Sequence, residues 1–116
     1  PMARVAWASL VAKLRRLRRA QYAIGDERLA ENASLDMLLD LLSAEFAGDP
    51  VTVTSLCAAS GVSQTTALRR IDELEGAGLL QRTPDPEDRR RIYVVLSESG
   101  RKRVLSYLSS VSHLIA

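Results

Sequence analysis

The pattern of apolar and polar positions predicts a mainly α-helical chain with one small β-hairpin. Most apolar residues recur at intervals of three and four, which is the period of an amphipathic helix. Two short runs instead alternate or stay apolar over a few residues, as strands do, and a segment rich in proline and charge separates them. The predicted helices are residues 3–23 and 34–47, two short helices around Gly61, and a last helix that starts near residue 97 or 98. The predicted strands are residues 79–83 and 91–97, with 51–53 as a candidate third.

Two short helices around Gly61 predict a helix-turn-helix. Gly61 lies where a tight turn needs an unhindered backbone. The second helix has one apolar side, on which Ala67, Ile71 and Leu74 are spaced by four and three. Its other side carries short polar side chains and arginines, which can reach base edges and phosphates in a DNA major groove. These candidate DNA-binding residues are Ser63, which is also a good N-cap, Gln64, Thr65, Thr66, Arg69 and Arg70.

The hairpin directly after this helix predicts a wing. Gly76 and Gly78 bracket the end of the second helix and leave room for a left-handed cap. Residues 84–90, PDPEDRR, then form the tip between the two strands. The predicted fold is therefore mainly α with a small β-hairpin wing, a winged helix-turn-helix in the order α-α-(β)-α-α-β-β-α. A winged helix that serves only protein contacts is the alternative from a different functional class.

The sequence resembles the MarR-type winged helix-turn-helix transcription regulators over roughly residues 35–105. The matching stretches are GVSQTTALRRIDELEGAGLLQR, DPEDRR and VVLSESGRK, the last standing where the family has a leucine-threonine-x-x-glycine run. The resemblance implies a dimeric, sequence-specific regulator, most simply a repressor. It further implies that the dimer binds a pseudo-palindromic site in double-stranded DNA.

The resemblance also implies roles within the wing. In the family, an aspartate two residues before an arginine holds that arginine for insertion into the minor groove. Counting back from the strand end at residues 94–96 places these roles on Asp88 and Arg90, and makes Arg89 and Arg91 phosphate contacts or neighbours of nearby acids. A guanidinium already held by a carboxylate loses less entropy on binding. The alternative is that these charges only solvate the hairpin tip.

Apolar stripes on the first and last helices are predicted to form a homodimer interface. The first stripe has the three-four spacing of a coiled-coil seam, and the last is more apolar than one side of a small domain requires. Packing only within the same chain is the alternative for the first helix. The predicted interface residues are Trp7, Leu10, Leu14, Leu17, Leu108, Val111 and Ile115.

One compact domain with three regions follows from these assignments. Residues 1–33 are the N-terminal dimerisation helix and its connection, residues 34–97 the winged helix-turn-helix DNA-binding region, and residues 98–116 the C-terminal dimerisation helix. Many members of the family bind a small phenolic or carboxylate effector between the dimer helices and the DNA-binding lobe. They are longer and have two helices after the wing, whereas one is predicted here, so the pocket is expected to be either absent or reshaped, and control by a small-molecule effector is doubtful.

The net charge of +2 hides an uneven distribution of charge. Residues 1–20 carry basic side chains and no acidic one, whereas acids outnumber bases between residues 21 and 60. Other basic residues gather on the second helix of the helix-turn-helix, on the wing and at residues 101–103. Such a basic face is what electrostatic attraction to phosphate needs. The arginine-rich run at residues 15–19 is either a solvated face or a secondary phosphate contact.

Candidate catalytic and metal-binding residues are few. The single histidine, His113, has no cysteine or carboxylate at ligand spacing. The single cysteine, Cys57, takes a slot between two helices that suits a small side chain, and a buried thiol is a poor nucleophile. We therefore expect no enzyme activity, no cofactor and no metal. A lone cysteine and the lack of a membrane-spanning apolar run favour a soluble protein of the bacterial cytoplasm.

Overall fold

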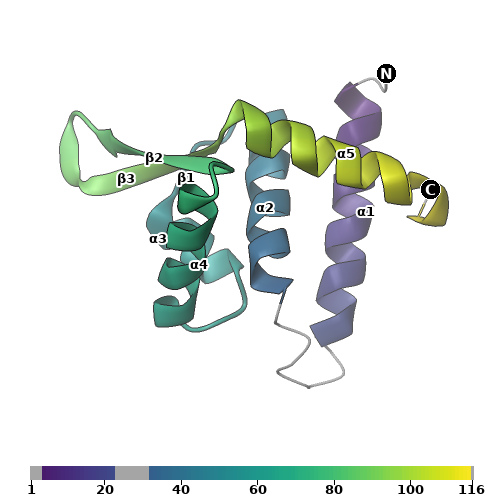
Figure 1. The fold of residues 1–116 in the computed structure, drawn as a ribbon, viewed down its shortest axis with the longest axis horizontal. Coiled ribbons are helices and arrows are strands. Elements are labelled where there is room, and N and C mark those ends of the chain that lie inside the picture. The colour runs from purple at the N-terminus through teal and green to yellow at the C-terminus, as the bar shows by residue number, and fades with distance from the viewer. Residues whose placement is uncertain (1–3, 23–31, 116) are drawn as a thin grey trace.

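The structure, a computed structural model, describes residues 4–22 and 32–115 (Figure 1). The predicted fold class is confirmed: the protein is mainly helical and carries a small antiparallel sheet in the winged helix-turn-helix order. Within the described residues, none of the helices is both long and apolar enough to cross a membrane. The elements are α1 (Arg4–Tyr22), α2 (Ala33–Ala47), β1 (Val51–Thr52), α3 (Val53–Ala59), α4 (Gln64–Gly76), β2 (Leu80–Asp85), β3 (Asp88–Leu96) and α5 (Glu98–Ile115).

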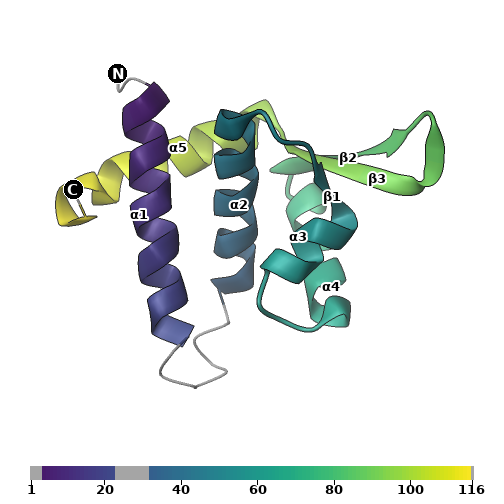
Figure 2. The ribbon, with the colours of Figure 1, turned by 180° about the vertical axis from the view of Figure 1, so that it is seen from behind.

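Helix α2 stands in the middle of the molecule. Helix α1 runs along one side of it, and α3, α4 and the sheet lie on the other side (Figures 1 and 2). Helix α5 starts where β3 ends and crosses α2 and α1, while the hairpin of β2 and β3 projects in the opposite direction. The connection predicted up to residue 33 falls largely on residues 23–31, which lie outside the described residues.

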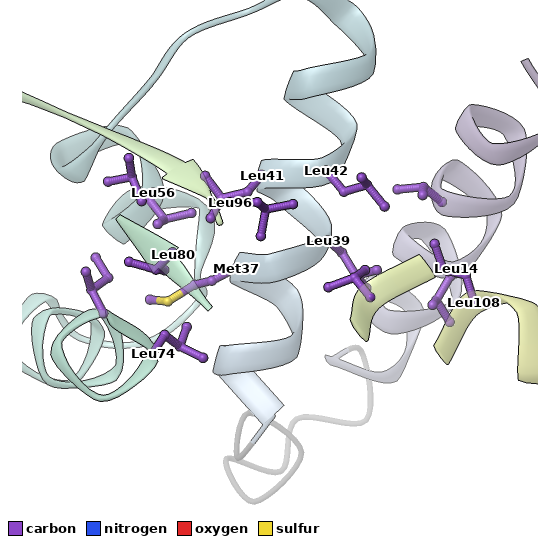
Figure 3. Close-up of a cluster of buried hydrophobic side chains, with 14 of the residues drawn as sticks. Leu14, Met37, Leu39, Leu41, Leu42, Leu56, Leu74, Leu80, Leu96 and Leu108 are labelled. Atoms are coloured by element: carbon purple, nitrogen blue, oxygen red, sulfur yellow. The ribbon is translucent and has the colours of Figure 1, made fainter. Parts of the chain in front are cut away.

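The hydrophobic core surrounds α2, which buries leucines on more than one side (Figure 3). Met37 lies toward Leu74 of α4 and Leu80 of β2, whereas Leu39 lies toward Leu14 of α1 and Leu108 of α5. A helix that is apolar around most of its circumference is stable only when neighbours cover it on all those sides. Both terminal helices are therefore needed to complete the core of a single chain.

This arrangement corrects part of the predicted dimer interface. Leu10 and Leu14 are each 5% exposed and Leu108 is fully buried, all within the chain's own core. They cover α2, so they have no surface left for a second chain. Leu17 is 46% exposed, and Trp7 and Val111 are half-buried. The side chain of Ile115 lies outside the described part of the chain.

Ion pairs fasten the terminal helices to α2. In the arginine-rich run, Arg15 contacts Asp40 at 2.8 Å and Arg18 contacts Asp36 at 2.9 Å. The guanidinium of Arg101, in α5, donates to both carboxylate oxygens of Glu45 at 2.7 Å. Two arginines of the run thus have partners in the same molecule, which removes them from the set available to phosphate.

The sheet has the strand order β1-β3-β2, and all its pairs are antiparallel. The candidate third strand is confirmed, since Val51 pairs with Val94. Leu80, Val94 and Leu96 are buried on the inner face of the sheet. Buried residues therefore hold the base of the hairpin, while the residues toward its tip are mostly exposed.

A close contact joins the start of α5 to the base of the wing. The Ser97 hydroxyl donates to the carbonyl oxygen of Gly78 at 2.6 Å and accepts the backbone N–H of Gly100 at 2.9 Å. The backbone N–H of Ser97 donates to the carbonyl oxygen of Leu79 at 3.0 Å. A Cβ atom at position 100 would collide with that same carbonyl, so only glycine fits there.

Candidate nucleic-acid interface

The helix-turn-helix forms as its sequence predicts. Gly61 adopts a positive φ of 77°, which glycine allows without steric strain. The Ser63 hydroxyl caps α4: it accepts the backbone N–H of Thr66 at 3.2 Å and donates to the Thr66 hydroxyl at 3.0 Å. Ala67, Ile71 and Leu74 are all buried in the core. The turn, the cap and this buried face together fix which side of α4 faces solvent.

The solvent side of α4 presents only part of the predicted set. Gln64, Thr65 and Arg69 are exposed. The side chain of Arg70 lies along the helix surface, where its guanidinium contacts Glu73, three residues further along α4, at 3.1 Å. Ser63 and Thr66 use their hydroxyls in the cap described above. The groups best placed to meet a ligand are therefore Gln64, Thr65 and Arg69.

The predicted aspartate–arginine pair is present in the wing. Asp88 Oδ1 accepts the backbone N–H of Arg90 at 3.0 Å and its Nε–H at 3.3 Å. The backbone N–H of Arg90, and then its side chain, lower the pKa of the Asp88 carboxyl, which keeps it ionised. The Arg90 side chain is nevertheless 92% exposed. It is a held cation that projects into solvent.

The two neighbouring arginines differ from each other. Arg91 Nη1 contacts Asp85 Oδ2 at 3.4 Å, and the Tyr93 hydroxyl donates to the same oxygen at 3.4 Å. The expectation that Arg91 neighbours an acid is thus met by Asp85. Arg89 is exposed. The exposed cations of the wing are therefore clustered near its tip.

A third ionic cluster joins α4 to the wing, and the sequence analysis missed it. Arg82 of β2 contacts Asp72 at 2.6 Å and Glu75 at 2.7 Å, both in α4. A signal was available, because a charged residue interrupts the apolar positions on the inner face of β2. The acids that this arginine meets could not be chosen from spacing alone, since the turn between helix and strand decides which of them comes close.

The single cysteine and the single histidine lie in different surroundings. Cys57 is 8% exposed, and burial raises the pKa of its thiol, so that the reactive thiolate is disfavoured. His113 is exposed near the end of α5. Across residues 4–22 and 32–115, no three or more histidine, cysteine, aspartate or glutamate side chains are grouped closely enough to hold a metal ion.

A capped helix after a tight turn, followed by a hairpin that projects beside it, defines a winged helix-turn-helix protein. Residues 47–92 match the sequence model of the MarR family. Over this region, which is less than half of the chain, the protein is similar to the MarR family.

Individual proteins are also similar to this chain. The uncharacterized HTH-type transcriptional regulator YcgE of Bacillus subtilis is 34% identical over 67 residues, which are 56% of this chain and 44% of YcgE. The transcriptional regulator Tm0710 of Thermotoga maritima is 29% identical with a TM-score of 0.57, over 80% of this chain and 59% of that one. The present chain therefore spans only about half the length of these relatives.

MepR of S. aureus is a further structural relative. Its structure with ethidium bromide is 25% identical with a TM-score of 0.62, over 72% of this chain and 58% of that one. Its structure in the DNA-binding conformation covers 87% of this chain and 75% of MepR, with a TM-score of 0.66. At 23% identity, that second likeness shows the fold alone.

Proposed function

We propose that this chain is a sequence-specific, double-stranded DNA-binding transcriptional regulator that acts as a dimeric repressor. Helix α4 enters the major groove, and the tip of the wing reaches the adjoining minor groove. The observation that carries the proposal is the Asp88–Arg90 pair, because it holds an exposed cation on a hairpin that projects beside an exposed polar helix face. A hairpin tip needed only for solubility does not require its arginine to be held in one orientation.

Each group of the interface then has a distinct task. Gln64 and Arg69 read base edges, since their side chains can make paired hydrogen bonds in the major groove. Arg90 enters the minor groove, where narrow A·T-rich tracts have the most negative potential. Arg89 contacts phosphate, which adds affinity without sequence preference. Thr65 extends the contact surface on α4.

The terminal helices supply the homodimer surface in this proposal. After the core is complete, Val5 is still 81% exposed and Leu17 46% exposed on α1. On α5, Tyr107 and Leu114 are 38% and 71% exposed, and Val111 is half-buried. Exposed apolar side chains on both helices support a partner there. Two copies would place two α4 helices on successive major grooves of a pseudo-palindromic site.

A gel-shift assay against random genomic fragments at two salt concentrations tests the proposal. A DNA-binding regulator selects a subset of fragments, and its affinity for all of them falls as salt rises, because bound arginines release counterions. A protein-interaction module selects no fragment at either salt concentration. If the chain binds all fragments equally and releases them at the higher salt concentration, it has only a basic surface that binds DNA without sequence selectivity.

A small-molecule effector is a second candidate, favoured by one pocket. A cavity of about 200 Å³ lies between α2, the base of the wing and α5, with Leu38, Val104 and Tyr107 among its apolar walls and Arg103 among its lining residues. MepR binds ethidium, which shows that a relative accepts a flat aromatic molecule. The cavity suits a small aromatic carboxylate, whose charge Arg103 would pair. A thermal-shift titration with benzoate, with Arg103→Ala as control, tests this; an equal shift in both proteins would exclude the site.

A further inference from the structure

The ionic cluster between Arg82 and α4 is more than a surface ion pair. Glu75 Oε1 accepts two hydrogen bonds from the Arg82 guanidinium, at 2.9 Å from Nε and 2.7 Å from Nη2. Glu75 Oε2 accepts the backbone N–H of Arg82 at 3.0 Å. Arg82 Nη2 also donates to Asp72 Oδ1 at 2.6 Å. One carboxylate thus binds both the backbone and the side chain of the same strand residue.

This geometry constrains orientation as well as distance. The Nε–H and Nη2–H groups of Arg82 converge on one oxygen of Glu75, and its other oxygen accepts the backbone N–H, so three hydrogen bonds limit rotation about the contact. The bond to the backbone N–H anchors the strand itself, so the strand cannot slide while the side chain stays bound. The side-chain hydrogen bonds from Arg82, followed by the bond from its backbone, lower the pKa of the Glu75 carboxyl, so it remains a charged acceptor at neutral pH.

Because Arg82 lies near the base of the wing, a small change of angle there moves the tip of the wing by a larger distance. Arg82 pairs with Val94 across the hairpin, whereas Arg90 lies four residues further toward the tip of β3. Four strand residues span about 13 Å, so a tilt of about 10° at Arg82 would move Arg90 by about 2 Å. A shift of that size breaks a hydrogen bond or removes a side chain from a narrow groove. The ion pairs nearer the tip, Arg91 with Asp85 and Arg90 with Asp88, join wing residues only to one another.

We propose that Arg82, clamped by Glu75 and Asp72, sets the angle between α4 and the wing, and is therefore a positioning residue for the minor-groove contact of Arg90. The inference rests on the proposed DNA-binding function and deepens it. The clamp makes the major-groove and minor-groove contacts a single rigid unit. Removing it uncouples them, so that the wing arginine is still present but no longer held in register with α4.

Glu75→Gln is the informative variant, because its two effects have opposite signs. It removes a negative charge from α4, which by electrostatics alone raises affinity for every DNA sequence. It also removes one strong acceptor from the clamp, which lowers affinity for the specific site alone. Glu73→Gln is the matched control, since it removes the same charge from the same helix and breaks only the Arg70–Glu73 pair, so that the contacts of Arg82 with Glu75 and Asp72 stay intact. Far-UV circular dichroism and thermal melting test whether both variants fold.

A double-mutant cycle with Arg90→Ala separates positioning from a merely structural role. We expect the fold-loss of specific affinity caused by Arg90→Ala to be about three- to tenfold smaller in the Glu75→Gln background than in the wild type. In the Glu73→Gln background that loss should equal the wild-type loss. An unchanged loss in Glu75→Gln overturns the proposal, even if that variant melts at a lower temperature.

A measurement without DNA keeps this inference distinct from the proposed function. Spin labels at positions 65 on α4 and 87 at the wing tip, placed in a Cys57→Ala background, report the angle through their separation. We expect one narrow distance distribution in the parent and in Glu73→Gln, and a broadened one in Glu75→Gln. Equal widths in all three overturn the clamp. A broadened distribution in a chain that selects no DNA fragment would instead show that the clamp exists and that the DNA-binding function is wrong.

Discussion

The two sides of α2 use apolar helix faces in different ways. On the side of α3, α4 and the sheet, the elements that pack together follow one another closely in the sequence, and turns and caps fix the orientation of each element. On the side of α1 and α5, the contacts join residues far apart in the chain, and apolar side chains remain exposed after the core is complete. The first side is therefore defined by local geometry, whereas the second is open to a further partner.

The largest expected effect comes from breaking the core on the α1 side. Leu14 is 5% exposed against α2, so Leu14→Glu buries a carboxylate without a partner. We expect it to lower the free energy of unfolding by at least about 3 kcal/mol, or to prevent folding altogether. Urea denaturation followed by circular dichroism measures this. If the Leu14→Glu protein is folded, monomeric and of unchanged stability, Leu14 belongs to the dimer interface and not to the core.

Leu17→Glu on the same helix should have a different consequence. Leu17 is 46% exposed, and a carboxylate there remains solvated in the monomer. We expect the far-UV spectrum to be retained and the molar mass from light scattering to fall from that of a dimer to that of a monomer. Lys13→Gln, which lowers the net charge by the same single unit at another solvent-exposed residue of α1, controls for the change of charge. A wild-type chain that is monomeric at micromolar concentration would contradict the homodimer directly.

These two leucines show where sequence reasoning was sufficient and where it was not. The Gly61 turn and the Ser63 cap were predicted because each depends on residues within a few positions of one another. The Asp88–Arg90 pair was expected from the family resemblance, and it too joins residues close together in the chain. Periodicity also found the apolar face of α1. Periodicity could not decide whether that face contacts α2 or a second chain, because either partner requires the same spacing of apolar residues on α1.

The interface shows the same boundary between local and distant contacts. The cap residues and the exposed residues of α4 lie near one another in the chain, so the solvent face of α4 was predicted. The contact of Arg82 with Glu75 depends on how the chain turns between α4 and β2, where Gly78 has a positive φ of 77°. That turn is visible as a glycine in the sequence, but the side chains that it brings together are not.

On the α4 side, Arg69→Ala should weaken recognition without affecting the fold. Arg69 is exposed, so its loss leaves the core intact. We expect a cost of about 1–3 kcal/mol in specific binding and relaxed preference at one base position per half-site. Affinities for a panel of single-base site variants measure this. If binding to every sequence weakens equally, Arg69 contacts phosphate and reads no base.

The smallest expected change in DNA affinity concerns Asp88, and its direction distinguishes two explanations of the wing. Its carboxyl pKa is lowered from 3.8, so it stays ionised at neutral pH, and its hold on Arg90 is lost only as the pH falls through that lowered value. Asp88→Ala removes a negative charge from a DNA-facing hairpin, which by electrostatics alone predicts tighter binding to all DNA. The orienting role predicts instead weaker binding to the specific site, and a reduced preference for A·T-rich flanks. Asp88→Asn keeps an acceptor for the backbone N–H of Arg90 but loses the charge. Its affinity for the specific site should therefore lie between that of the wild type and that of Asp88→Ala. Specific affinity that rises in Asp88→Ala at fixed salt would reduce the wing to a non-specific basic surface.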